Sequence, residues 1–83
     1  MEIFYTQKAA KQFKNLPHLI QKRIAEKMRF YASQNNPLKF AKHLSDNREG
    51  EFRFRVGNYR LIFDVRVDMI YVLKIDRRDK IYE

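Results

Sequence analysis

The sequence predicts an α+β fold in which an N-terminal helical hairpin packs on one face of a mainly antiparallel sheet, in the order β-α-α-β-β-β. Three observations predict it. Apolar residues recur at helical spacing between residues 7 and 33, alternate strictly with polar ones over 52–56, and form a nearly continuous run over 69–75. At 83 residues the chain has the size of one small domain, and we expect residues 1–83 to form it.

The first part of the chain is expected to contain a short strand and two helices. Residues 2–5 are the strand, and Thr6 is the side-chain cap of a helix over 7–16. Pro17 interrupts this helix and is tolerated as the first residue of the next one. The second helix runs from about 18 to 33, and its core-facing stripe consists of Ile20, Ile24, Met28 and Tyr31.

The segment after the second helix is less regular. Asn35-Asn36-Pro37 ends the helix, because the residue before a proline avoids the α region. Residues 38–48 are predicted to be irregular, with a helical turn that places Phe40 and Leu44 against the core. The apolar run over 69–75 predicts a central strand covered on both faces.

A β-hairpin over residues 52–66 is the strongest structural signal in the chain. Gly57-Asn58 is typical of a two-residue loop in a type II′ turn, with the glycine at its first position. Such a loop sets the register of the two strands and places Arg55 opposite Arg60. The buried face of the hairpin then consists of Phe52, Phe54, Val56, Tyr59, Leu61, Phe63 and Val65.

The other face of the hairpin carries Arg53, Arg55 and Arg60. Like charges directly opposite each other on a sheet are destabilising, so this arrangement has a folding cost. Guanidinium groups match the oxygens of a phosphate, which makes a phosphate the natural ligand of such a patch. The alternative is an ordinary solvated strand face in a basic protein. The spacing favours an exposed anion site but leaves both interpretations open.

The composition limits the functional classes. A formal net charge of +8 and a pI near 10.0 favour nucleic acid, an acidic membrane surface or an acidic protein as partner. The chain has no cysteine, so neither a disulfide framework nor a thiolate metal site is available. No apolar run reaches the length of a signal peptide or a membrane span. We therefore expect a cytoplasmic protein without cofactor, metal or membrane partner.

The remaining polar candidates have structural interpretations. His43 and His18 lack further ligands at metal-binding spacing and are expected to be structural or at the surface. Asp64 is expected to be a counter-charge for Arg66 or Arg53 rather than a general base. Helix lysines form a solvated face or contact ribosomal RNA phosphates, and they are Lys8, Lys11, Lys14, Lys22 and Lys27.

Two blocks of sequence carry a family resemblance. Residues 51–65 contain the pattern Arg-x-Arg-Val-Gly-x-Tyr-Arg, and residues 72–75 are followed by an arginine pair and a closing Ile81-Tyr82. In these blocks, and in the order and length of its elements, the chain resembles the RelE/ParE superfamily of bacterial and archaeal type II toxins. The resemblance covers nearly the whole chain.

The resemblance implies a function and its alternatives. RelE-like members are mRNA interferases that cleave messenger RNA in the ribosomal A site without a metal, and ParE-like members poison DNA gyrase. The first implication is therefore a ribosome-dependent endoribonuclease, acting by attack of a 2′-hydroxyl on the scissile phosphate. The alternatives are a gyrase inhibitor, or a non-toxic module that binds an antitoxin and operator DNA.

The same resemblance implies partners for the chain. A small antitoxin with an acidic amphipathic segment is expected in every case, and operator DNA is expected to be bound through the antitoxin complex. The endoribonuclease also implies messenger RNA and the ribosome as partners.

The resemblance also implies site residues. Arg60 falls on the arginine that contacts the scissile phosphate, and Tyr82 on the tyrosine that stacks on a base or takes part in proton transfer. Arg78, in preference to Arg77, falls on the arginine near the C-terminus. The catalytic residues implied in this way are Arg53, Arg55, Arg60, Arg78 and Tyr82.

The chain departs from the family pattern at one place that concerns the chemistry. Asp76-Arg77 stands where many relatives have Gly-His or Gly-Lys, so no C-terminal histidine is present to act as a base. Guanidinium groups stabilise a phosphorane well but stay protonated, so the arginines are poor bases. Tyr82, acidified by the neighbouring arginines, is the candidate base or stacking group.

Overall fold

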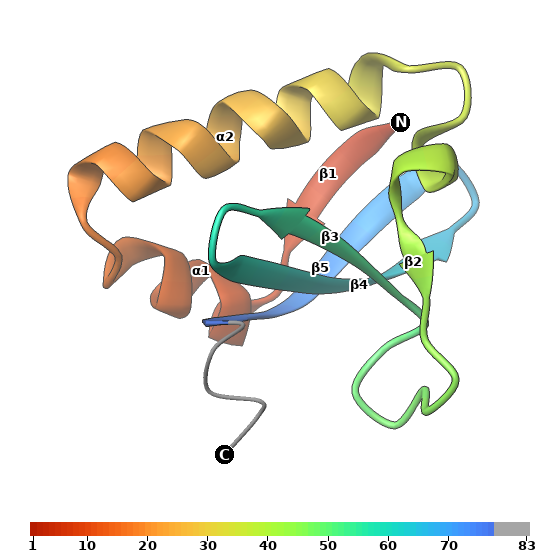
Figure 1. Cartoon of the computed structure of the whole chain (residues 1–83). Coiled ribbons are helices and arrows are strands. Elements are labelled where there is room, and N and C mark those ends of the chain that lie inside the picture. Colours follow the sequence, from red (N-terminus) through yellow and green to blue (C-terminus); the bar gives the residue numbers. More distant parts are fainter. Residues whose placement is uncertain (78–83) are drawn as a thin grey trace.

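The computed structural model describes residues 1–77, which form a five-stranded sheet with two α-helices packed against it (Figure 1). The predicted α+β class and element order are confirmed, with one further short strand, β2, before the hairpin. The elements are β1 (Glu2–Tyr5), α1 (Gln7–Lys14), α2 (His18–Ser33), a 3-10 turn η1 (Pro37–Phe40), β2 (Lys42–His43), β3 (Phe52–Val56), β4 (Tyr59–Arg66) and β5 (Met69–Arg77).

The strand order across the sheet is β1-β5-β4-β3-β2. β1 pairs with β5 in parallel, and the other pairs are antiparallel, so the sheet is mainly antiparallel as predicted. β5 lies between β1 and β4, which confirms its central position. The expected cover on both faces is not complete, since Tyr71 and Leu73 are only half-buried. Tyr71 packs edge-on against Phe4, which is itself 50% exposed, at a ring distance of 5.4 Å.

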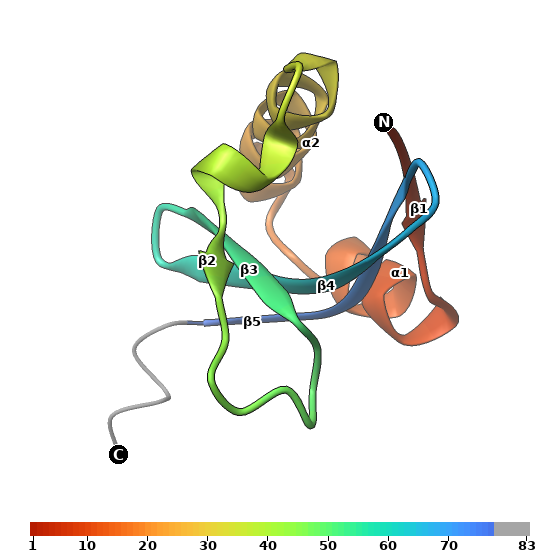
Figure 2. The ribbon, with the colours of Figure 1, turned by 90° about the vertical axis from the view of Figure 1, so that its right-hand side faces the viewer.

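The two helices begin close to where the sequence predicts. The Thr6 hydroxyl accepts a hydrogen bond from the Ala9 N–H at 3.2 Å, so Thr6 caps α1 as predicted. α1 ends at Lys14, two residues before the predicted end, and Pro17 is the N-cap of α2 rather than its first helical residue. Figure 1 shows α2 running along one side of the sheet, and Figure 2 shows it nearly end-on above the strands.

The core lies between the helices and the sheet. Ile24, Met28 and Tyr31 of α2 are buried, and Ile20 packs against them, which confirms the predicted stripe. All seven residues predicted for the buried face of the hairpin lie in this core or pack against it. The Phe54 ring is stacked between Tyr31 and Phe63, at ring distances of 4.3 Å to each.

The prediction that Phe40 and Leu44 pack against the core is confirmed only for Phe40, whose ring lies 5.6 Å from that of the core residue Tyr31, and not for Leu44. Phe40 is 44% exposed, and Leu44 is half-buried and lines a pocket beside Arg60. Leu38 and Ala41 also pack against the core.

The cap residue Thr6 and the α1 side chain of Gln12 hydrogen-bond to β5 where β1 ends. The Thr6 N–H donates to the Val72 carbonyl at 3.0 Å, and the Thr6 hydroxyl donates to the Leu73 carbonyl at 3.3 Å. Further along, the Ile75 N–H donates to Gln12 Oε1 at 2.7 Å. These contacts satisfy polar groups of β5 that the short strand β1 does not reach.

No helix in residues 1–77 is long and apolar enough to cross a membrane.

Candidate functional site

The hairpin has the register that its turn predicts. Arg55 pairs with Arg60, and Arg53 pairs with Ile62. Gly57 has a φ of 59°, in the left-handed region that a type II′ turn requires at its first position. Residues paired across antiparallel strands point to the same face, so the three predicted arginines lie together on the face away from the core.

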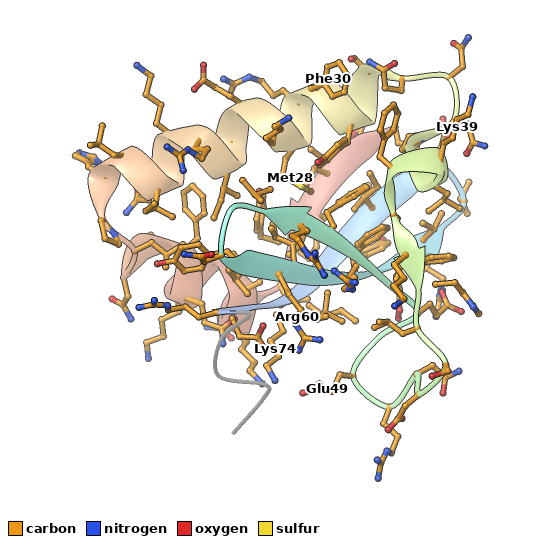
Figure 3. All side chains as sticks on the ribbon, viewed as in Figure 1. Met28, Phe30, Lys39, Glu49, Arg60 and Lys74 are labelled. Atoms are coloured by element: carbon orange, nitrogen blue, oxygen red, sulfur yellow. The ribbon has the colours of Figure 1, made fainter. Side chains whose placement is uncertain are left out.

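Two lysines extend this group of arginines on the neighbouring strands. Lys42 of β2 pairs with Arg53, and Lys74 of β5 pairs with Ile62. We call these residues the basic face, and they are Lys42, Arg53, Arg55, Arg60 and Lys74. Figure 3 shows Arg60 and Lys74 on the side of the sheet away from α2. Neither lysine is among the site residues predicted from the sequence.

A β-bulge in β5 places Lys74 on the basic face. Leu61 pairs with Ile75, but Phe63 pairs with Val72, so β5 has one more residue than β4 between these two pairs. In a regular strand, Lys74 would point to the same side as the buried Val72. The extra residue reverses this alternation and returns Ile75, rather than Lys74, to the core.

Arg60 is not freely exposed, contrary to what the anion-site interpretation expects. Its Nε and one terminal nitrogen donate to the two carboxylate oxygens of Asp76, at 3.1 and 3.2 Å. The side chains of this pair are 17% and 21% exposed. The residue at which the chain departs from the family pattern therefore supplies the counter-charge of Arg60. A phosphate that binds Arg60 has to compete with Asp76 or share the guanidinium with it.

Lys74 connects this ion pair to the loop before β3. Its Nζ lies 3.4 Å from Asp76 Oδ2 and 2.5 Å from Glu49 Oε2. The hydrogen bond with Glu49 is the main cause that raises the pKa of Lys74, burial opposes it, and the charges of Glu49 and Asp76 add to the increase. Lys74 is therefore a permanent cation at neutral pH.

Among the three predicted arginines on the hairpin, Arg55 is the most accessible. Its side chain is exposed and makes no ion pair or side-chain hydrogen bond within residues 1–77. Arg53 is half-buried. The basic face thus combines a guanidinium open to solvent with a second one, across the hairpin, that is held by a carboxylate.

The loop over residues 44–51 is fixed against the sheet beside these cations. Gly50 is buried, and a Cβ at this position would lie 2.5 Å from Ile62 Cγ2, so the close approach requires glycine. The Glu51 N–H donates to Asp64 Oδ1 at 2.8 Å, and Asp64 also lies 3.5 Å from Arg66. Asp64 is therefore a structural carboxylate with Arg66 as a counter-charge, as expected.

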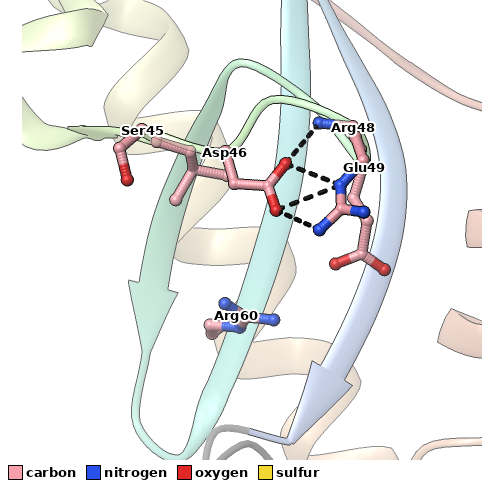
Figure 4. Close-up of a pocket in the computed structure, with 6 residues that line it drawn as sticks. Ser45, Asp46, Arg48, Glu49 and Arg60 are labelled. Carbon is pink, nitrogen blue, oxygen red and sulfur yellow. Dashed lines mark hydrogen bonds and ion pairs between the residues drawn. The ribbon is translucent and has the colours of Figure 1, made fainter.

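A pocket opens between this loop and β4 (Figure 4). Its volume of about 570 Å³ lies within the range of small-molecule sites, roughly 300–1,000 Å³. Asp46 and Arg48 form a bidentate pair on its wall, with a shortest distance of 2.6 Å, and Arg48 lowers the pKa of Asp46 by hydrogen bonding. The lining residues are Leu44, Ser45, Asp46, Arg48, Glu49 and Arg60.

The other predicted residues are not all placed with the basic face. His43 is exposed and its ring lies 5.1 Å from that of Phe52, and His18 is exposed at the start of α2. Within the described residues 1–77, no group of three or more His, Asp or Glu side chains could hold a metal ion. Arg78 and Tyr82 lie outside the described residues, so their place in the site stays a prediction.

Comparison with known proteins identifies relatives of the whole chain. Residues 3–82 match a family described as the ParE toxin of a type II toxin–antitoxin system. No curated protein matches the chain.

Solved structures are also similar to the chain. One is the toxin–antitoxin complex RelBE2 from Mycobacterium tuberculosis, with a TM-score of 0.77 and 26% identity, where the match covers 93% of this chain and 96% of that one. Another is the RelB–RelE antitoxin–toxin complex from Methanococcus jannaschii, with a TM-score of 0.68 and 30% identity, covering 96% and 95% of the two chains.

Proposed function

The chain belongs to the ParE toxin family, in the RelE/ParE superfamily of type II toxin–antitoxin toxins, and we propose that it is a metal-free endoribonuclease that cleaves messenger RNA on the ribosome. The observation that carries this proposal is the pairing of Arg55 with Arg60 on an accessible face beside an open pocket. Opposed arginines weaken a sheet, and a phosphate bound between them would offset that repulsion.

The proposed reaction is an attack of a ribose 2′-hydroxyl on the adjacent phosphorus. The hydroxyl loses its proton, a pentacovalent phosphorane forms, and the 5′-oxygen leaves and takes up a proton. Arg55 and Arg60 would hold the non-bridging oxygens and stabilise the charge of the phosphorane, which is usually the largest contribution to such catalysis. Arg53 would add charge at the neighbouring register position.

Proton transfer is assigned to the end of the chain. Tyr82 is proposed to stack on a base or exchange the proton, and Arg78 to stabilise the leaving oxygen. Within residues 1–77, the carboxylates beside Arg60 are already held in ion pairs, Asp76 by Arg60 and Glu49 by Lys74. We therefore expect cleavage to depend on ribosomal RNA to complete the site.

We also propose that a cognate antitoxin covers this protein. The two similar structures are complexes of a toxin with an antitoxin. A formal charge of +8 favours a partner segment that is acidic, and an amphipathic segment would also cover exposed aromatic rings such as Phe30 and Phe40. Operator DNA would then be bound through the complex, and a ribosomal target would place the toxin in the cytoplasm.

A translation assay with a defined message tests the endoribonuclease. Arg55→Ala is the sharpest variant, because this side chain is exposed and its removal breaks no ion pair or side-chain hydrogen bond within residues 1–77. We expect the wild type to cut the message in translating ribosomes and Arg55→Ala to cut it at least about tenfold more slowly. Arg29→Ala removes an exposed arginine from α2 and should cut like the wild type. An intact message at saturating wild-type protein would refute the proposal.

Gyrase inhibition is the second candidate, and two observations favour it. The family that matches the chain is described as the ParE toxin of a type II toxin–antitoxin system. In addition, the Arg60 guanidinium is paired with Asp76 and is not free to bind a phosphate. In this case the basic face would contact protein or DNA without cleaving a phosphodiester. A supercoiling assay with purified gyrase distinguishes the candidates, because only a gyrase inhibitor would stop supercoiling while leaving the translated message intact.

A further inference from the structure

We propose that Arg60 and Lys74 form a phosphate-binding subsite that the chain fills with its own carboxylates, and that Glu49 is the occupant that an RNA phosphate displaces. The proposal rests on the proposed contact of the basic face with RNA and names a further cation of that site, Lys74, together with its competitor. Glu49 then limits RNA affinity.

The proposal rests on a continuous series of ion pairs that links Glu49, Lys74, Asp76 and Arg60. Glu49 contacts Lys74 at 2.5 Å, Lys74 contacts Asp76 at 3.4 Å, and Asp76 holds Arg60 through two hydrogen bonds of 3.1 and 3.2 Å. Carboxylate and phosphate oxygens bind the same ammonium and guanidinium donors. The carboxylates therefore occupy the positions at which a phosphate would be bound.

The two carboxylates differ in how readily they can leave. Asp76 belongs to β5, pairs in register with Arg60, and is 21% exposed. Glu49 belongs to the loop, is 55% exposed, and makes its ion pair with Lys74 alone among residues 1–77. Exposed ion pairs contribute little, since solvent screens them and they restrict long side chains. Glu49 is thus the replaceable partner.

Displacement of Glu49 requires movement of its side chain and not of the loop. Gly50, the next residue, is packed under the side chains of Ile62 and Leu73, and Glu51 is tied to Asp64 through its backbone. The pocket beside Glu49 and Arg60 provides space for the incoming group. Arg55, opposite Arg60, continues the row of cations, so a bound strand can cross β3, β4 and β5.

RNA binding by a charge-matched pair of variants tests the proposal. Glu49→Gln removes the competing charge, whereas Glu26→Gln makes the same change of net charge at an exposed position on α2. In fluorescence anisotropy with a labelled single-stranded RNA, we expect Glu49→Gln to tighten binding about three- to tenfold. Glu26→Gln should change it less than about twofold. Equal effects of the two variants would overturn the proposal, as would the absence of RNA binding by all variants.

A second variant tests whether the tighter RNA binding expected of Glu49→Gln depends on Lys74. We expect Lys74→Gln to weaken RNA binding and to reduce the slope of log K against log salt by about 0.7, because one phosphate contact is lost. In a Lys74→Gln background, Glu49→Gln should give no further gain, since the cation that it releases is absent. A gain that persists in this background would overturn the proposal. Circular dichroism and thermal unfolding confirm that each variant is folded.

The binding assay and the cleavage assay test the two proposals separately, so either proposal can be refuted while the other stands. If Glu49→Gln tightens RNA binding while translated messages stay intact, the subsite stands and the endoribonuclease does not. If the message is cut but Glu49→Gln behaves like Glu26→Gln, the endoribonuclease stands and the subsite does not.

Discussion

At the scale of single residues, Asp76 has the largest influence on the candidate site. It neutralises Arg60 through a bidentate contact and also lies near Lys74, so one carboxylate reduces the charge that two cations present. The side chain at position 76 therefore determines how strongly Arg60 can bind a phosphate.

Replacing Asp76 separates its structural effect from its effect on binding. Asp76→Asn keeps the shape but leaves the Arg60 guanidinium, 17% exposed, without its ion pair. We expect the free energy of unfolding to fall by about 1–3 kcal/mol and the affinity for single-stranded RNA to rise. Urea denaturation and anisotropy measure the two quantities.

Asp46→Asn is the control for this change. It breaks the exposed pair with Arg48 and should leave stability unchanged, because both partners are solvated. If Asp76→Asn weakens RNA binding instead, then Asp76 orients Arg60 for the ligand and does not compete with it.

Gly50 determines how closely the loop lies on the sheet. A Cβ at this position would lie 2.5 Å from Ile62 Cγ2 and 3.2 Å from Leu73 Cδ1. We expect Gly50→Ala to lower the free energy of unfolding by about 1–3 kcal/mol through overpacking. Asn47→Ala, an exposed change in the same loop, should have little effect. Unchanged stability of Gly50→Ala would mean that the loop can lift from the sheet at little cost.

At the scale of elements, the contact between α1 and β5 extends the sheet beyond the end of β1. The Ile75 N–H donates to Gln12 Oε1, so a helix side chain replaces a strand partner. We expect Gln12→Ala to lower the free energy of unfolding by about 1–3 kcal/mol, because the N–H loses its acceptor. Hydrogen exchange of the Ile75 amide should become faster.

Gln7→Ala, at the exposed start of α1, is the control for Gln12→Ala. It should alter neither stability nor exchange. Unchanged exchange in Gln12→Ala would show that water replaces the glutamine without loss.

The sequence predicts a site residue only where a local pattern sets the register of its strand. A two-residue loop sets the pairing of β3 with β4, so Arg55 opposite Arg60 could be predicted. The bulge in β5 could not, because the apolar run around it hides the change of alternation. Lys74 was missed for this reason. β2 has two residues, too few for a periodic pattern, and Lys42 was missed with it.

At the scale of the whole molecule, the face of the sheet that carries the candidate site is separate from the face that carries the core. The hairpin contributes alternate residues to each, so the aromatic side chains stabilise the fold while the arginines lie on the opposite face. The ion pairs of Arg60 and Lys74 explain how a chain with a charge of +8 can place several cations on neighbouring strands. An incoming phosphate replaces part of this internal compensation.

The dependence of stability on alkaline pH follows from three groups within residues 1–77. Burial raises the pKa of Tyr5 and Tyr31 above 10.0, and the hydrogen bond with Glu49 raises the pKa of Lys74 above 10.5. Each group binds its proton more tightly in the folded state, so its contribution is complete below the unfolded pKa and is lost as pH rises through the folded one. We therefore expect the free energy of unfolding to fall above about pH 10.

A variant of Tyr31 tests whether this residue contributes to the loss of stability at alkaline pH. Its side chain is 8% exposed, and its ring packs on Phe54, so Tyr31→Phe keeps the packing and removes the titrating hydroxyl. The hydroxyl donates to the Arg55 carbonyl at 3.5 Å, a weak contact whose loss should lower stability slightly at every pH. We expect urea denaturation to show a shallower alkaline fall for Tyr31→Phe than for the wild type. An equally steep fall would mean that Tyr31 contributes little to the alkaline loss of stability, which would leave Tyr5 and Lys74 as its sources.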